Sequence, residues 1–105
     1  MLNKFMARDR RPSRQMLALL RALHEAAPRW SHGYDLMKST GILSGTLYPL
    51  LMRMSDQALV EAEWQAPEQP GRPARHAYRL TATGLALARQ VAEARDPLDS
   101  KALPA

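Results

Sequence analysis

Apolar residues recur at helical spacing in the first half of the chain. The first stripe has a period of about 3.6 residues and consists of Met16, Leu17, Leu20, Leu23 and Ala27. With Ser13 as the expected N-cap and Pro28 as the stop, this pattern predicts a first helix. Residues 33–40 form a second apolar segment that ends at Gly41, a residue that accepts the left-handed backbone of a helix C-terminus. They predict a helix of about two turns.

The third segment is the most informative because its two faces differ. Its apolar stripe, spaced i, i+3, i+4, i+7 and i+11, consists of Leu47, Leu50, Leu51, Met54 and Ala58. At about 100° per residue, the opposite face carries Gly45, Pro49, Met52, Arg53 and Asp56, with Thr46 and Tyr48 on its flanks. The pattern therefore predicts a helix with one buried face and one free face.

Pro49 indicates where this third helix begins. With Thr46 as the N-cap, Pro49 is the third helical residue, and its missing N–H has no intrahelical partner to lose. With Ser44 as the N-cap, the proline lies deeper in the helix and should distort the first turn. In either case the proline marks a helix start.

Beyond residue 58 the pattern becomes that of a β-hairpin. Residues 59–64 and 76–80 both alternate approximately, which predicts two short strands. The loop between them contains Pro67, Pro70, Gly71 and Pro73 and should be stiff. Thr81 then caps a last helix predicted over residues 82–95. Residues 96–105 are polar with two prolines and are expected to form a disordered tail.

The order of these elements predicts a fold that is mainly α with a small β-hairpin. Three helices, a hairpin and a C-terminal helix, with a short link over residues 41–46, are the order of a winged helix-turn-helix. The winged helix-turn-helix DNA-binding domain would span residues 13–80, after a basic arm or short helix at residues 1–12. The helix at residues 81–95 is expected to form a dimer.

Composition and charge narrow the function classes. The 105 residues indicate a single domain, and the absence of cysteine excludes disulfides, thiol catalysis and thiolate metal sites. Lys and Arg number 15 against 10 Asp and Glu, a net charge of +5 that attracts phosphate and makes nucleic acid the first partner to test. The longest apolar run, residues 16–20, is too short for a membrane span or a signal-peptide core. We therefore expect a cytoplasmic protein that does not contact membranes.

Three ordered blocks of residues resemble a known family. They are residues 33–36 (GYDL), residues 44–51 (SGTLYPLL) and residues 71–81 (GRPARHAYRLT), with Gly84 following. Over about residues 16–87 the chain resembles the PadR family of bacterial transcriptional regulators. The resemblance implies a winged-helix repressor that binds double-stranded DNA as a homodimer. We expect no cofactor. A dimer would favour a roughly palindromic operator. Some members of the family respond to small aromatic or amphipathic compounds, and the sequence leaves such an effector open.

The expected DNA contacts lie on the third helix and in the hairpin loop. They are Ser44, Gly45, Thr46, Tyr48, Pro49, Arg53, Arg72 and Arg75. A helix N-terminus favours an anion, and arginines on a loop suit phosphates or a narrow minor groove. The expected dimer contacts are Leu2, Phe5, Met6, Leu85, Ala88, Val91 and Ala92. Ala58 stands where the family usually has a glycine, so the turn after the third helix must form without one.

Plainer interpretations stand beside these. Tyr48 on a helix flank is also typical of half-buried packing, and Arg53 equally fits an exposed i, i+3 pair with Asp56. Trp30 and Trp64 are expected to pack in the core or at a sheet edge.

Two other function classes fit the sequence less well. His24, His32 and His76 lack metal-ligand spacing, so we expect no metal. No acid is placed to orient His32 beside Ser31, and we reject an enzyme. The runner-up is a winged-helix module that binds a protein. Such modules usually show an acidic or apolar third-helix face and a neutral wing, and this sequence has neither.

Overall fold

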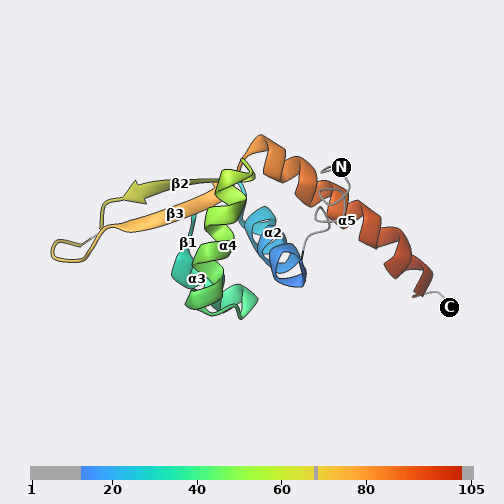
Figure 1. The fold of residues 1–105 in the computed structure, drawn as a ribbon, viewed down its shortest axis with the longest axis horizontal. Helices are drawn as coiled ribbons and strands as arrows, with labels where there is room; N and C mark the ends of the chain where they lie inside the picture. The colour runs from blue at the N-terminus through green and yellow to red at the C-terminus, as the bar shows by residue number, and fades with distance from the viewer. Residues whose placement is uncertain (1–12, 68, 103–105) are drawn as a thin grey trace, which may run out of the picture.

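The computed structural model describes residues 13–67 and 69–102, which form four helices and three strands (Figure 1). In chain order they are α2 (Arg14–Ala26), β1 (Ser31–His32), α3 (Gly33–Thr40), α4 (Ser44–Asp56), β2 (Val60–Gln65), β3 (Arg75–Leu80) and α5 (Ala82–Ala102). The arm predicted over residues 1–12, with Leu2, Phe5 and Met6, lies outside the described residues. No helix in the described ranges is long and apolar enough to cross a membrane.

The first two predicted helices are confirmed together with their ends. Helix α2 starts after Ser13, whose side-chain oxygen accepts a hydrogen bond from the Met16 backbone N–H at 3.1 Å. This bond satisfies one of the amides that a helix N-terminus leaves without a partner. Helix α3 ends at Gly41, which adopts the left-handed backbone with φ 80°. The short link from Gly41 to α4 then completes a helix-turn-helix.

The start of α4 differs from both predicted caps. The N-cap is Leu43, whose extended backbone carries no side-chain cap, so Ser44 and Thr46 are helical residues. Pro49 therefore stands well inside the helix, where it cannot donate to the Gly45 carbonyl. The first turn is tightened, because the Thr46 and Leu47 amides both donate to the Leu43 carbonyl, at 3.0 and 2.8 Å. Burial of Leu47 and of Ile42 in the preceding link fixes this start in place of a hydroxyl cap.

The sheet contains the predicted hairpin and one further strand. All pairs are antiparallel, in the order β1-β3-β2, with register from Val60 opposite Leu80 to Gln65 opposite Arg75. The strand β1 has only two residues, too few to give a periodic signal, and the sequence did not predict it. Figure 1 shows the hairpin projecting away from the helices, with its loop at the far end. We call the loop over residues 66–74 the wing tip.

Two boundaries after α4 need correction. Ala58 was predicted to continue the apolar stripe, but α4 ends at Asp56 and Ala58 is exposed with φ 62°. It forms the turn into β2, where the chain must reverse. The last helix continues to Ala102, so residues 96–102 are not the predicted disordered tail. Pro97 favoured a helix end, but a proline removes a single backbone donor and a helix can continue through it.

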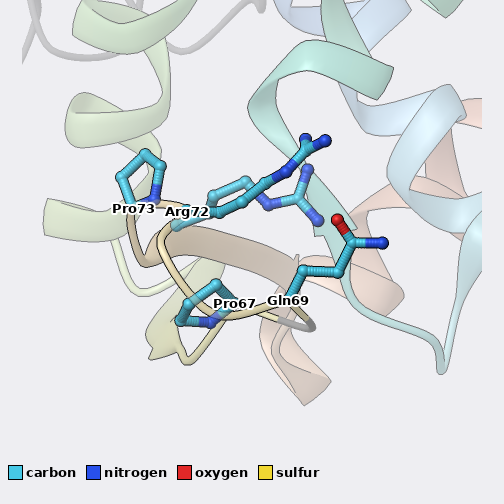
Figure 2. A pocket seen from close by; sticks show the side chains of 5 residues that line it. Pro67, Gln69, Arg72 and Pro73 are labelled. Atoms are coloured by element: carbon cyan, nitrogen blue, oxygen red, sulfur yellow. The ribbon is translucent and has the colours of Figure 1, made fainter.

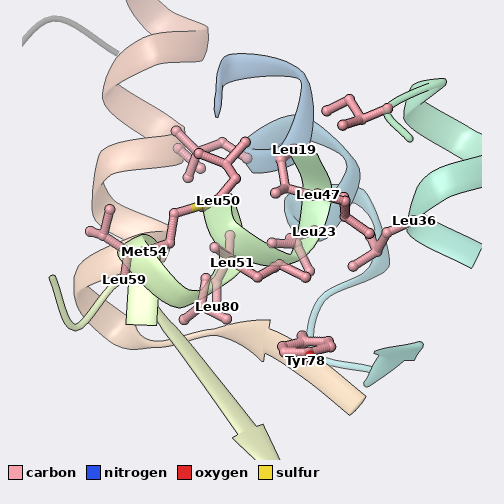
Figure 3. Close-up of a cluster of buried hydrophobic side chains, with 14 residues drawn as sticks. Leu19, Leu23, Leu36, Leu47, Leu50, Leu51, Met54, Leu59, Tyr78 and Leu80 are labelled. Atoms are coloured by element: carbon pink, nitrogen blue, oxygen red, sulfur yellow. The ribbon is translucent and has the colours of Figure 1, made fainter. Parts of the chain in front are cut away.

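The hydrophobic core lies between α4, α2 and the base of the hairpin (Figure 3). Its buried residues are Leu19, Leu20, Leu23, Leu36, Ile42, Leu47, Leu50, Leu51, Met54, Leu59, Val60, Tyr78, Leu80 and Ala88. The predicted buried stripe of α4 is thus confirmed at four of its five positions, all except Ala58. Because close-packed side chains hold this stripe, the opposite face of α4 is turned outward.

Candidate nucleic-acid interface

The outer face of α4 presents small and hydroxylated residues at its N-terminal end. Ser44, Gly45 and Thr46 are exposed, and a Cβ on Gly45 would meet only open space. The first turn holds no acidic residue, and no side chain caps its amides. These groups and the positive end of the helix dipole favour an anion at this point. Pro49 and Arg53 continue the exposed face, so this part of the predicted site lies together.

The face also carries apolar residues that the predicted contact set does not include. Leu43, directly before α4, is 74% exposed and Met52 is 68% exposed. Leu43 was missed because a residue in a turn has no periodic partner that would distinguish a buried position from an exposed one. Met52 was placed on the correct face by helical spacing but was given no role.

Tyr48 is both exposed and seated on a neighbouring helix. Its side chain is 40% exposed, while its ring lies so close to Gly33 that a Cβ on that glycine would overlap the ring and the hydroxyl. Tyr48 is therefore half-buried packing on one side of its ring, as the plainer interpretation has it, and the other side of the ring faces solvent. Gly33 positions Tyr48, and no sequence pattern had assigned it that role.

Tyr78 lies behind Tyr48 at the junction of the hairpin with the helices. Its side chain is buried, and its backbone pairs with Ser31 of β1. Burial raises the pKa of the Tyr78 phenol above its ordinary value of 10.0, and the neighbouring Tyr48 phenol raises this pKa further. Tyr78 is consequently a neutral packing residue at physiological pH.

The wing tip gathers polar and cationic side chains around a pocket. Pro67, Gln69, Arg72, Pro73 and Arg75 line a cavity of about 300 Å³. Figure 2 shows Arg72 and Gln69 extending their polar ends to the same side of the loop, with Pro67 and Pro73 near its backbone. Gly71 adopts φ 89°, and the Arg72 amide donates to the Gln69 carbonyl at 3.3 Å. This turn and the prolines fix the loop that carries Arg72 and leads into Arg75 at the start of β3.

The other charged and aromatic candidates differ in whether they have local partners. Arg79 donates to Glu61 at 2.8 Å, and its guanidinium lies 4.2 Å from the centre of the Trp30 ring. The structure records two such contacts among the described residues: this ion pair, and His32 Nδ1 at 3.8 Å from Asp35 Oδ2, which is an ion pair only when the imidazole is protonated. The prediction that no acid lies near His32 is therefore wrong. The suggested Arg53–Asp56 pair is not one of these two contacts, which leaves the Arg53 guanidinium on the open face. Trp64 is 65% exposed on the edge strand β2, so the sheet-edge interpretation is the correct one for this residue.

The histidines are placed separately in the fold. His32 shares a hydrogen bond of 2.9 Å with the Gln65 side chain, linking β1 to β2 across β3. His76 stacks on Trp64, with 3.9 Å between ring centres. Within residues 13–67 and 69–102, no three His, Asp or Glu side chains gather in a way that could hold a metal ion.

The predicted dimer contacts on α5 divide into two groups. Ala88 is 5% exposed in the core of its own subunit, and Leu85 packs against the same core. Ala88 is therefore wrong as a dimer contact, because α5 uses this side to pack on α2. Ala92 is exposed and Val91 is half-buried, so both remain available at the surface.

A helix-turn-helix followed by a hairpin and a further helix defines the class of protein as a winged helix-turn-helix. The family profile described as "Transcriptional regulator PadR-like family" matches residues 19–90, so the chain belongs to the PadR-like family. This is a family of transcriptional regulators and not of enzymes. The predicted fold class and family are thereby confirmed.

Solved structures agree with this assignment. A PadR family transcriptional regulator from Eggerthella lenta DSM 2243 is 30% identical, with 80% of this chain and 76% of that chain covered and a TM-score of 0.64. NadR in complex with 4-hydroxyphenylacetate is 26% identical, with coverages of 85% and 59% and a TM-score of 0.69. MepR of S. aureus in its DNA-binding conformation is 15% identical, with coverages of 90% and 66% and a TM-score of 0.72, and shares the fold. No curated protein sequence matched the chain.

Proposed function

We propose that the protein is a sequence-specific DNA-binding regulator that acts as a homodimer and represses transcription by blocking a promoter. The observation that carries this proposal is the presence of two exposed elements on one domain. The N-terminal half of α4 presents hydroxyls and a helix N-terminus without an acid or a side-chain cap, and Arg72 of the wing tip lines one pocket with Arg75, the first residue of β3. A helix and a basic loop on one domain suit the major groove and the adjacent backbone of a duplex.

In this proposal α4 reads the major groove. The Ser44 and Thr46 hydroxyls hydrogen-bond to base edges or phosphates, and Gly45 lets the backbone approach closely. Leu43 and Met52 add exposed apolar surface suited to thymine methyl groups. Arg53, Tyr48 and Pro49 lie next to this surface. In the proposal they contact the two DNA strands at the edges of the groove.

The wing supplies contacts that do not depend on sequence. Arg72 and Arg75 both line the wing-tip pocket, so one phosphate can be approached by two guanidinium groups. The prolines around them restrict the loop before binding, which lowers the entropy lost when DNA orders it. These contacts set affinity and orientation, whereas α4 sets discrimination.

A dimer would place two such units on one face of the DNA. We propose that the free surface of α5, including Val91 and Ala92, contributes to it. Two-fold symmetry then demands a roughly palindromic operator with half-sites about 34–36 Å apart. Because NadR is solved with 4-hydroxyphenylacetate, a small aromatic acid is the first effector to test.

Selection of bound fragments from a random duplex pool tests this function. The proposal expects enrichment of a palindromic sequence, with affinity falling roughly 10³- to 10⁵-fold between 50 and 200 mM salt if six to ten phosphates are neutralised. A flat salt response would contradict it. If no duplex is retarded and a single protein is retained after nuclease treatment, the protein-interaction module is the correct function.

A further inference from the structure

We propose that His32 is a positioning residue that holds the wing in place relative to the helix-turn-helix, and that it does so most firmly when its imidazole is protonated. His32 lies between the two elements that the proposed function assigns to DNA. It immediately precedes Gly33, against which the Tyr48 ring packs, and its Nε2 lies 2.9 Å from Oε1 of Gln65, the last residue of β2 before the wing tip. The effect on DNA rests on the proposed function, whereas the contact itself can be tested without DNA.

The outer part of the hairpin extends beyond its backbone pairing with β1. That strand pairs with β3 only at Tyr78 and Ala77, while the hairpin continues outward to the pair of Gln65 with Arg75. Figure 1 shows this part projecting away from the helices. Among the hydrogen bonds between side chains within residues 13–67 and 69–102, the bond from His32 to Gln65 is the one that joins the outer hairpin to the segment leading into α3. A bond at this point resists bending of the hairpin away from α3.

The contact belongs to a chain of four side chains, Asp35, His32, Gln65 and Glu63, which we call the wing bridge. The Gln65 side-chain amide donates to Glu63 Oε2 at 3.2 Å. Since a carboxylate can only accept, this bond turns the amide nitrogen toward Glu63 and the amide oxygen toward His32, so His32 Nε2 carries a hydrogen. At the other edge of the ring, Nδ1 lies 3.8 Å from Asp35 Oδ2. Both ring nitrogens of His32 therefore face oxygen acceptors.

An imidazolium satisfies this arrangement, and a neutral imidazole does not, because the neutral ring carries a single N–H. With that hydrogen on Nε2, the lone pair of Nδ1 faces the Asp35 carboxylate. With the hydrogen on Nδ1, the Gln65 amide must turn over to donate to Nε2, and its oxygen then faces the Glu63 carboxylate. Each neutral form loses one favourable contact, so protonation strengthens the wing bridge. Histidine side chains change their charge between about pH 5 and 8.

Charged side chains surround the wing bridge on several elements. They are Glu25, Arg29, Asp35, Glu61, Glu63, Arg75 and Arg79. The strand residues of this set share one face of the sheet with His32, and Glu61 and Arg79 pair with each other. Arg75, opposite Gln65, opposes a further positive charge, whereas Asp35 and Glu63 at the two ends of the bridge favour it. Asp35 is 67% exposed, so water screens its attraction and we expect an effect of a few-fold.

Affinity for a selected duplex at fixed salt, measured at about pH 8 and about pH 6, tests the role of His32. We expect the unaltered protein to bind roughly two- to fivefold more tightly at the lower pH. His32→Gln should lose this gain, because glutamine keeps a polar group but takes up no proton. His24→Gln, at a histidine of α2 outside the wing bridge, is the matched control and should keep the gain. If His32→Gln keeps it too, the proposal is wrong.

Asp35→Ala distinguishes the wing bridge from a simple attraction between a protonated histidine and DNA. It leaves His32 in place and removes the acceptor that faces Nδ1, at a side chain exposed enough to be replaced without loss of the fold. The wing bridge requires Asp35→Ala to lose the gain in affinity as His32→Gln does. If Asp35→Ala keeps the full gain, the proton acts by general attraction to the duplex and the wing bridge is overturned.

The unbound protein provides a measurement that does not depend on DNA. A double-mutant cycle of His32→Gln and Asp35→Ala by chemical denaturation gives the coupling between the two side chains. It should be roughly two- to fivefold in the unfolding equilibrium constant at about pH 6 and nearly absent at about pH 8. Equal coupling at both pH values, or none at either, overturns the wing bridge even if a duplex is bound. The expected coupling without any effect of pH on affinity overturns the positioning role, and the expected coupling without any bound duplex contradicts the proposed function alone.

Discussion

Helix α4 and the wing tip are proposed to touch the same duplex, yet they are held in opposite ways. Leu47 and Met54 are fully buried beneath α4, so its outer face is fixed by the core. The wing tip has no such packing and owes its shape to prolines, to the turn at Gly71 and to pairing between the strands. A rigid base suits hydrogen bonds to base edges, which fail when displaced by about 1 Å. A locally restrained loop suits phosphates, which tolerate more displacement.

Removing core support from α4 should have the largest effect on stability. Leu47→Ala leaves a cavity at a side chain with no exposed surface and should cost about 2–5 kcal/mol of unfolding free energy. Urea denaturation measures the loss. Arg72→Ala at the exposed wing tip is the control and should change stability by less than about 0.5 kcal/mol. Equal losses in the two variants would contradict the contrast between the regions.

Crowding Tyr48 tests how its side chain is positioned. Gly33→Ala places a methyl group where the Tyr48 ring now lies, so the exposed ring must swing toward solvent and lose its contact with α3, at a cost of about 1 kcal/mol. In a Tyr48→Ala background the same substitution should cost little, because the obstacle is gone. A double-mutant cycle by chemical denaturation gives the coupling. The same cost in both backgrounds would show that Gly33 does not seat Tyr48.

Exchanging alanine and glycine at two turns tests the backbone around α4. Ala58 has φ 62°, so Ala58→Gly should raise stability by about 1 kcal/mol. Gly41 has φ 80° with open space at its Cβ position, so Gly41→Ala is the matched reverse and should lower stability by a similar amount. Thermal unfolding measures the change in stability of both variants. Changes of the same sign would contradict the assignment of strain to positive φ.

The junction between the two regions should show the smallest effect, at alkaline pH. The unfolded Tyr78 phenol ionises near its ordinary pKa of 10.0, while burial raises the folded pKa, so the folded state keeps its proton longer. Stability is therefore full below about pH 10 and falls as pH rises through the folded pKa. Tyr78→Phe should flatten this decline, whereas Tyr34→Phe, at a side chain 62% exposed, should not. Unfolding free energies measured from pH 8 upward decide the matter, and parallel declines in the two variants would refute it.

Periodicity predicted the parts of the fold that repeat. The helices at residues 33–40 and from Ser13 onward, the buried stripe from Leu47 to Met54 and the hairpin all carry spacings that a packed element imposes on its sequence. The two-residue strand β1 has no spacing to detect. The N-cap at Leu43 was not predicted from the sequence, because the usual signal for an N-cap is a polar side chain. Here the packing of Leu47 takes the place of a polar cap.

The candidate site was predicted in outline, and its supporting contacts were not. Exposure of Thr46, Arg72 and Arg75 followed from the opposite face of an amphipathic helix and from a proline-rich loop. The seat of Tyr48 on Gly33 depends on two elements meeting in space. The stack of Trp64 on His76 likewise depends on hairpin register, which the long loop left open.

The division of labour between α4 and the wing can be tested directly by one measurement, the ratio of affinities for a selected duplex and a scrambled duplex at fixed salt. Thr46→Ala should lower this ratio because it removes a hydroxyl from the base-reading face. Arg72→Ala should weaken both duplexes evenly, keep the ratio and reduce the salt slope by about one for each phosphate that is no longer neutralised. A ratio that falls in Arg72→Ala and is retained in Thr46→Ala would contradict the account.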